Sequence, residues 1–195
     1  LIPGVFAIFL ISVSLTMAQD CTPTVSKRAE TLPLGTNHNA AVWHPQLQQA
    51  FLFGGTEAVG STLDIRFYDH IIKFGPNGQN AITMATKLPR PRFSLAAVFY
   101  PGNQKIYLFG GQTFEKVGSM NIATGESKVS EFNPQNSHLS INGELEHALL
   151  SPSAIYVNSL DKILVFGGFI MNQLPKKRSN AIIEYDPKNG QSKIV

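Results

Sequence analysis

The sequence predicts an all-β protein built from three copies of one four-stranded unit. Two markers recur in the same order in each copy along the 195-residue chain. The first is a hydrophobic run ending in two glycines, at residues 50–55, 106–111 and 163–168. The second is an aromatic side chain two positions before a proline, at residues 74, 132 and 185. A fixed repeat indicates stacked copies of a single supersecondary unit, and no segment beyond residue 18 shows the sustained 3.6-residue period of a helix.

Each copy divides into four short β-rich runs separated by turn residues. In the first copy we expect these runs at residues 38–43, 50–53, 70–74 and 81–84. Turn chemistry lies between them, as in His44-Pro45 and Pro76-Asn77-Gly78. The second run is apolar throughout instead of alternating, which predicts a strand covered on both faces by neighbouring sheets. The glycine pair that follows can adopt φ values closed to other residues, so the backbone can leave a crowded strand end there.

These motifs resemble the kelch-repeat β-propeller superfamily. The resemblance extends over residues 32–195 and rests on the strands ending in Phe-Gly-Gly, on Tyr185-Asp186-Pro187, and on the Leu-Pro-Arg-Pro-Arg run at 88–92. It implies a kelch-type β-propeller, in which four-stranded sheets, or blades, are arranged radially about a common axis. The kelch motif positions would be Gly54, Gly55, Gly110, Gly111, Gly167, Gly168, Phe74, Phe132 and Tyr185.

The repeat boundaries define the expected organisation of the chain. Residues 37–87, 88–144 and 145–195 would each form a blade, the last cut short within its fourth strand. Residues 19–36 would form an N-terminal segment that includes an outer strand without a blade of its own. Propellers close with roughly four to eight blades, and three open blades would expose apolar faces and unpaired edges. We therefore expect a parent ring of about six or seven blades, or alternatively a short chain that closes its ring by oligomerising.

The N-terminal 18 residues predict a secretory signal peptide. They contain no charged side chain, and residues 5–15 are almost continuously apolar, as in the central region of such a signal. Small residues at Thr16 and Ala18 place the expected cleavage before Gln19. An uncleaved signal anchor is the competing interpretation. Export implies an oxidising compartment. There the single cysteine, Cys21, could pair with a cysteine in a segment outside this sequence or in another chain, or remain a free thiol.

Composition excludes several function classes. The formal net charge is only +3, and the one basic cluster is Lys176-Lys177-Arg178, which is too small to indicate a nucleic-acid surface. No HExxH, GxSxG or P-loop motif occurs, and the five histidines show no metal-ligand spacing. We therefore expect no catalytic residues, cofactor or metal site within these residues, and no membrane contact beyond the signal peptide.

Candidate ligand contacts lie before the second blade and in the segments after the glycine pairs. Kelch proteins that bind peptides use an arginine at the position matched by Arg92, so the resemblance implies a carboxylate contact there, with Arg90 beside it; a structural role between blades is the alternative. The segments at 56–69, 112–127 and 169–180 share no motif, which predicts variable loops that carry recognition. The candidate residues in these segments are Glu57, Glu115, Lys116, Lys176, Lys177 and Arg178.

Three functional hypotheses follow from these observations. The first is an extracellular kelch scaffold that binds a protein or glycan partner through loops on one face. The second rests on a resemblance to galactose oxidase, a secreted copper enzyme with kelch-like blades, whose catalytic residues would lie outside these residues. The third is an intracellular kelch adaptor for ubiquitin ligases or actin. Metal content and the location of the protein separate the three.

Overall fold

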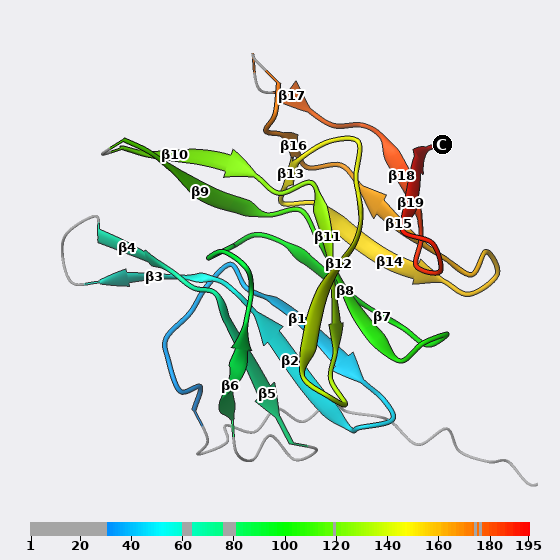
Figure 1. Cartoon of the computed structure of the whole chain (residues 1–195), viewed down its shortest axis with the longest axis horizontal. Helices are drawn as coiled ribbons and strands as arrows, with labels where there is room; N and C mark the ends of the chain where they lie inside the picture. The colour runs from blue at the N-terminus through cyan, green and yellow to red at the C-terminus, as the bar shows by residue number, and fades with distance from the viewer. Residues whose placement is uncertain (1–30, 60–63, 76–80, 119, 174, 176) are drawn as a thin grey trace, which may run out of the picture.

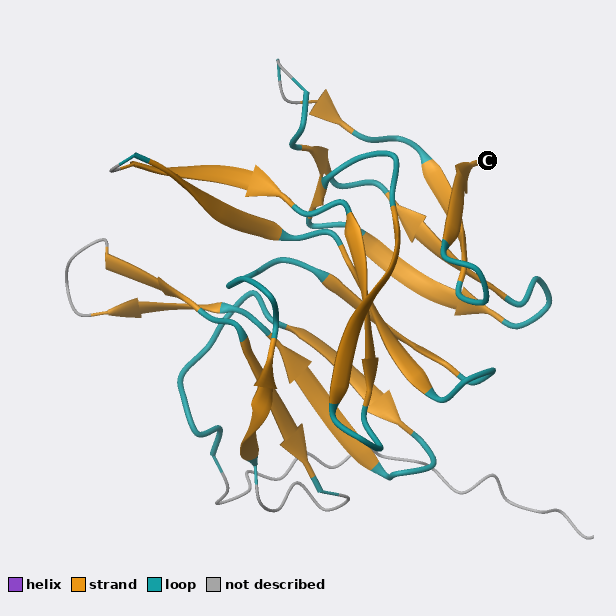
Figure 2. Cartoon of the chain, in the orientation of Figure 1, coloured by secondary structure: helices purple, strands orange, loops and turns teal. Residues whose placement is uncertain are grey.

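The computed structural model describes residues 31–59, 64–75, 81–118, 120–173, 175 and 177–195. All regular elements in this part of the chain are β-strands, and none is a helix (Figure 2). The prediction of an all-β fold is therefore confirmed. The expected signal peptide, the outer strand before residue 31 and Cys21 lie outside the described residues. Within the described ranges, no helix is long and apolar enough to cross a bilayer.

Three four-stranded antiparallel sheets form the body of the molecule, and their strands correspond one to one (Figure 1). Sheet 1 has the order β1 (Ala40–His44), β2 (Gln49–Phe53), β5 (His70–Phe74) and β6 (Ile82–Lys87). Sheet 2 contains β7 (Ala96–Tyr100), β8 (Lys105–Phe109), β11 (Lys128–Asn133) and β12 (His138–Glu144). Sheet 3 contains β14 (Ser153–Val157), β15 (Lys162–Phe166), β18 (Ile182–Asp186) and β19 (Gln191–Ile194). The fold is consistent with a β-propeller-like arrangement.

The segments that follow the glycine pairs differ from the loops expected there, because they form additional strand pairs. After the second strand of sheet 1, β3 (Thr56–Val59) pairs with β4 (Asp64–Phe67), and after that of sheet 2, β9 (Gln112–Val117) pairs with β10 (Met120–Gly125). After β15 of sheet 3, β16 (Phe169–Ile170) pairs with both β17 (Lys177–Arg178) and β13 (Leu149–Leu150), which precedes the sheet. Antiparallel pairing satisfies backbone groups that an irregular loop would leave to water, so segments unrelated in sequence still become hairpins.

The sheets stack face to face, and two hydrophobic cores lie between them. Between sheets 1 and 2 the core includes Phe53, Leu108 and Phe132, and between sheets 2 and 3 it includes Phe109 and Tyr185. The middle strand β8 contributes to both cores, and its last four residues are fully buried. The expectation that an entirely apolar second strand is covered on both faces is therefore confirmed for β8. It is wrong for β2 and β15, whose buried residues alternate with half-buried ones because a neighbouring sheet covers only one face.

Backbone hydrogen bonds also join one sheet to the next. The amide of Ser94 donates to the carbonyl of His38 at 2.7 Å, and the amide of Ser151 donates to the carbonyl of Ser94 at 3.0 Å. These three residues precede the first strand of their sheets and share a left-handed backbone, with φ values of 53°, 52° and 55°. Non-glycine residues rarely adopt this conformation, so its recurrence shows that each sheet begins in the same way.

Candidate functional site

The candidate site lies on the hairpins that leave the sheets directly after their second strands. The β3–β4 hairpin follows Gly55, and the β9–β10 hairpin follows Gly111. These two hairpins extend side by side in the same direction (Figure 1), and ring contacts between Phe67 and Phe114 connect them. The β16–β17 pair follows Gly168 in sheet 3. Recognition commonly lies in such variable elements on a repeated scaffold.

The glycine pairs set the direction in which the chain leaves the second strand to form these hairpins. Gly54 shows why the first position of the pair requires glycine. Its φ is +61°, and a Cβ atom there would lie 1.9 Å from the carbonyl oxygen of Arg92. The next amide, that of Gly55, donates to the same oxygen at 2.9 Å. Gly110 and Gly167 have the same φ of 61°. The predicted role of these glycines at the strand ends is therefore confirmed.

Three phenylalanines form an aromatic cluster between the first two hairpins, which we call the aromatic seam. Phe67 ends β4, Phe93 precedes β7, and Phe114 lies in β9. The ring of Phe67 lies 4.3 Å from that of Phe114 and 5.5 Å from that of Phe93, measured between centroids. All three side chains are half-buried. Close ring pairs of this kind add stability beyond the area that they bury.

Backbone hydrogen bonds hold the segment that carries Phe93 in place. Phe93 and Gln112 exchange both of their amide-to-carbonyl bonds, at 3.2 and 2.9 Å. One residue earlier, the amide of Arg92 donates to the carbonyl of Tyr68 at 3.0 Å. The segment before β7 is therefore fixed to both hairpins, and the seam is preorganised.

Arg92 lies inside the joint between sheets 1 and 2. Its side chain is buried, and one guanidinium nitrogen, Nη2, donates to the Oγ of Ser130 at 3.2 Å. Burial lowers the pKa of Arg92 to about 10, so the side chain remains charged at neutral pH. A buried charge needs nearby polar partners. This placement favours the role between sheets over direct contact with a ligand.

Arg90 is better placed for contact with a partner. Its Nη2 atom lies 3.3 Å from the Oε2 of Glu126, which follows β10, and the guanidinium is partly exposed. Glu126 is largely buried, and its other oxygen accepts a bond from the amide of Lys128 at 3.0 Å. The ion pair lies at the base of the second hairpin, the hairpin that also carries Phe114.

Glu57 lies on β3, opposite Arg66 of β4. Its carboxylate accepts a hydrogen bond from the hydroxyl of Tyr68, and this bond, together with burial, raises the pKa of the tyrosine above its ordinary value. The ring of Tyr68 stacks on His70 with centroids 5.1 Å apart. The first hairpin therefore presents a carboxylate whose position is set by a neighbouring phenol.

Of the remaining candidate residues, only Lys177 and Arg178 have side chains that the structure describes. Lys177 and Arg178 are exposed on β17, where the Arg178 guanidinium lies 5.7 Å from the ring centroid of Phe169. This cation–π contact forms a second patch on the third hairpin. Lys176 and the side chains of Glu115 and Lys116 lie outside the described residues.

Sequence reasoning missed all three rings of the aromatic seam. When the three copies are aligned on their glycine pairs, the positions equivalent to Phe114 hold Ala58 in the first copy and Met171 in the third. The position equivalent to Phe93 in the first copy holds Asn37. A repeat motif contains only the residues that the copies share. Residues that occur at the contact between only two of the sheets are therefore not part of it. The contact becomes visible only when the two hairpins are placed together.

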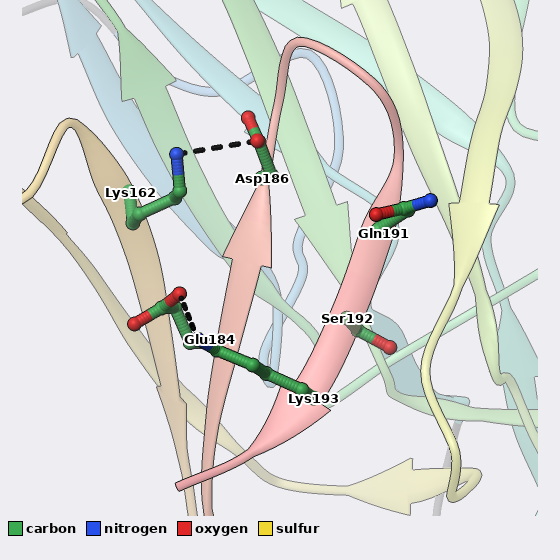
Figure 3. A pocket seen from close by; sticks show the side chains of 6 residues that line it. All are labelled: Lys162, Glu184, Asp186, Gln191, Ser192 and Lys193. Atoms are coloured by element: carbon green, nitrogen blue, oxygen red, sulfur yellow. Dashed lines mark ion pairs between the residues drawn. The ribbon is translucent and has the colours of Figure 1, made fainter.

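A shallow pocket of about 260 Å³ lies elsewhere, on the outer face of sheet 3 (Figure 3). Two ion pairs cross it: Lys162 with Asp186 at 3.2 Å, and Lys193 with Glu184 at 3.0 Å. The charges are thus compensated within the pocket, which gives it no preference for a charged ligand. Among the described residues, no three histidine, cysteine, aspartate or glutamate side chains are grouped to hold a metal ion.

Comparison with known proteins supports the fold but not an activity. The chain is similar to a solved structure described as "Structure of YjhT", with a TM-score of 0.62 and 14% sequence identity. The match covers 84% of this chain and 51% of that chain, so this chain spans about half of its length. At this identity the likeness concerns the fold alone. No protein-family model matches the chain, and no functionally characterised protein matches it by sequence.

Proposed function

We propose that this chain is part of an extracellular kelch-type β-propeller that binds a protein partner through its hairpins. The aromatic seam carries this proposal. Three half-buried rings held by backbone hydrogen bonds, with the Arg90–Glu126 ion pair nearby, combine features of binding hot spots: aromatic and arginine side chains on a rigid support. A rigid surface loses little conformational entropy on binding.

The ring geometry favours a protein over a glycan. Phe93 is nearly parallel to both Phe67 and Phe114, with interplanar angles of 30° and 19°. These rings therefore direct part of their faces at one another, whereas a sugar needs an open aromatic face to stack on. Apolar side chains of a partner can instead pack against the exposed edges.

The kelch-type assignment is supported by the position of the motif aromatics. Phe132 and Tyr185 are fully buried between consecutive sheets, as the radial packing of blades requires. We propose that the three sheets are blades of a ring larger than three. The proposed extracellular location rests on the apolar N-terminal segment, and recovery of a secreted protein beginning at Gln19 would test it.

The binding proposal is tested by immobilising the protein and its Phe114→Ala variant. Each is exposed to an extracellular protein fraction from the source organism and, separately, to a panel of glycans. The matched control is Ile122→Ala, which removes an exposed side chain from the neighbouring strand β10. We expect a protein that binds the wild type and the control but binds Phe114→Ala at least ~10-fold more weakly, a loss of about 1.4 kcal/mol.

Other outcomes would change the proposal. A glycan whose binding depends on Phe114 would replace the protein partner. Partners that bind Phe114→Ala as tightly as the wild type would show that the aromatic seam is not the binding site. Stoichiometric copper in the purified secreted protein would favour the copper-enzyme hypothesis over the scaffold.

A further inference from the structure

The last strand of each sheet pairs with only one neighbour among the described strands, and most of these last strands carry charge. The charged ones are β4, β6, β12, β17 and β19, which contain Asp64, Lys87, Glu144, Arg178 and Lys193 respectively. Charged side chains along an edge discourage another chain from pairing with it. The exception is β10, whose sequence Met-Asn-Ile-Ala-Thr-Gly contains neither a charged residue nor a proline. The second hairpin therefore lacks the protection that the other edges have.

The free backbone groups of β10 follow from its register. Gln112 lies opposite Gly125 in the hairpin, but its amide and carbonyl bond to Phe93 on the other side of β9. In an antiparallel pair, bonded and non-bonded positions alternate. The N–H and C=O groups of Ala123 and Asn121 therefore point away from β9. Within the described part of the chain they bond to no other backbone group, so β10 presents a regular row of donors and acceptors.

Apolar side chains flank this row on both faces of the hairpin. Ala123 lies opposite Phe114, so it shares the face of the aromatic seam. A strand added beside β10 would lie about 4.8 Å away, and only the methyl group of Ala123 would separate its side chain from the ring of Phe114. On the other face, Ile122 is 44% exposed. An added strand therefore meets an aromatic ring on one face and an aliphatic side chain on the other.

We propose that the protein partner adds an extended segment to β10, so that the β9–β10 hairpin becomes a three-stranded sheet. This inference rests on the function proposed above and specifies the chemistry of the partner: a main chain in β conformation with an apolar residue opposite Ala123. In complexes of this kind, backbone hydrogen bonds supply the affinity and alternate side chains supply the specificity. The residue opposite Ala123 enters the aromatic seam, and the residue next to it contacts Ile122.

A second copy of this chain is the other source of a strand, and the surroundings of β10 disfavour it. A Cβ atom at Gly125 would lie 2.6 Å from the Cβ of Met171 and 2.9 Å from that of Ala148, so the base of β10 is packed against residues near sheet 3. A single added strand needs only about 4.8 Å beside β10. A second copy would have to bring its own hairpin and sheets into the same space.

A synthetic peptide tests this mode of binding on the intact 195-residue chain. The peptide alternates valine and threonine between two terminal lysines, and its analogue carries an N-methyl group on every valine and threonine nitrogen. The analogue keeps the side chains but has lost its backbone donors. In an NMR titration we expect the peptide to bind with a dissociation constant below ~1 mM, and the analogue to bind at least ~10-fold more weakly.

The protein variants remove one donor at a time. Ala123→Pro deletes an outward N–H and leaves the hydrogen bonds between β9 and β10 in place, because proline is tolerated on an edge. It should weaken peptide binding at least ~10-fold. Ala123→Ser keeps the N–H and is the matched control, with binding within ~2-fold of the wild type. Ile122→Ala also keeps the backbone, and its lost cross-strand contact should weaken binding by less than ~5-fold.

Hydrogen exchange on the wild type needs no variant and so does not depend on whether Ala123→Pro folds. The amides of Asn121 and Ala123 should exchange rapidly in the free protein and at least ~10-fold more slowly with saturating peptide. The amides of Ile122 and Thr124 bond to β9 and should be protected in both states. Equal exchange of Asn121 and Ala123 with and without bound peptide would contradict strand addition.

The outcomes separate this inference from the proposed function. Binding that survives Ala123→Pro but is lost in Phe114→Ala would overturn strand addition and leave the aromatic seam as the binding site. Binding that survives both substitutions would overturn both proposals. A peptide that does not bind below ~5 mM, or an analogue that binds as well as the peptide, would also overturn strand addition. So would a wild-type dimer that Ala123→Pro converts to a monomer, because a second copy would then occupy the edge.

Discussion

The hydroxyl of Tyr107 donates a hydrogen bond to Glu131 at 2.7 Å, inside the interface between sheets 2 and 3. The same carboxylate accepts bonds from Lys105 at 2.5 Å and from Asn142 at 2.7 Å. Burial by itself raises the pKa of Glu131, but these three donors outweigh burial and hold the pKa below its ordinary value. The polar end of this interface is thus stabilised by an ionised carboxylate.

The first prediction concerns the acid limb of stability. Because the pKa of Glu131 is lower in the folded protein, its stabilising effect is present above the unfolded value of about 4.3 and is lost as the pH falls through the folded value. Glu131→Gln should cost ~1–3 kcal/mol at neutral pH, and this difference should shrink in acid. Urea unfolding at several pH values measures it. Glu146→Gln, at an exposed position, is the control, and a difference that does not change with pH would contradict the argument.

The second prediction concerns the alkaline limb. All five tyrosines have pKa values above their ordinary value, and burial is the main cause for Tyr107 and Tyr185. An acid whose pKa is raised by folding stabilises the protein below its unfolded value of about 10 and loses this effect as the pH rises further. Phenolate absorbance should therefore show these two groups ionising together with unfolding. Ionisation of Tyr107 and Tyr185 while the fold remains intact would contradict this prediction.

The third prediction compares two glycines with nearly equal φ. Gly54 has φ +61° and would bring a Cβ to 1.9 Å from a carbonyl oxygen, whereas Gly118 has φ +63° and nothing within 4 Å. Gly118→Ala should therefore cost only the backbone strain, ~1 kcal/mol. Gly54→Ala adds a backbone clash and should cost several times more. Thermal or urea unfolding of both variants measures the difference, and equal losses would show that the clash relaxes freely.

The fourth prediction concerns the joint between sheets 1 and 2. Phe132 is fully buried and contacts two phenylalanines of sheet 1, so Phe132→Ala should destabilise the fold by about 3–5 kcal/mol. The same substitution at the exposed Phe169 should cost clearly less. Unfolding in urea gives both values. A similar loss at the two positions would mean that the inter-sheet ring contributes little.

Much of the fold could be predicted from the sequence because its signals are repeated. The glycine pairs and the apolar second strands occur three times, and both glycines of every pair have the positive φ that favours glycine. The hairpins were expected to be loops, because Thr56–Val59 and Gln112–Val117 share no pattern to indicate pairing. Their pairing depends on local backbone geometry after the glycines.

The candidate site could be predicted less well. Glu57 lies on the first hairpin and Arg90 pairs with Glu126 at the base of the second, but Arg92 is buried in the joint between sheets. The resemblance gave Arg92 a place in the motif, and only packing determines whether its guanidinium faces solvent. Phe67, Phe93 and Phe114 come from three separate segments, so their contact depends on how sheets 1 and 2 stack.

The bonds from Ser94 to His38 and from Ser151 to Ser94 use only peptide groups, which every residue except proline can supply in full. At these points the backbone joins one sheet to the next without the help of a particular side chain. Evolution can replace the residues of a sheet, or duplicate or delete a whole sheet, while this connection is kept. A structure with 14% identity can then share the fold, while the hairpins remain free to differ in sequence.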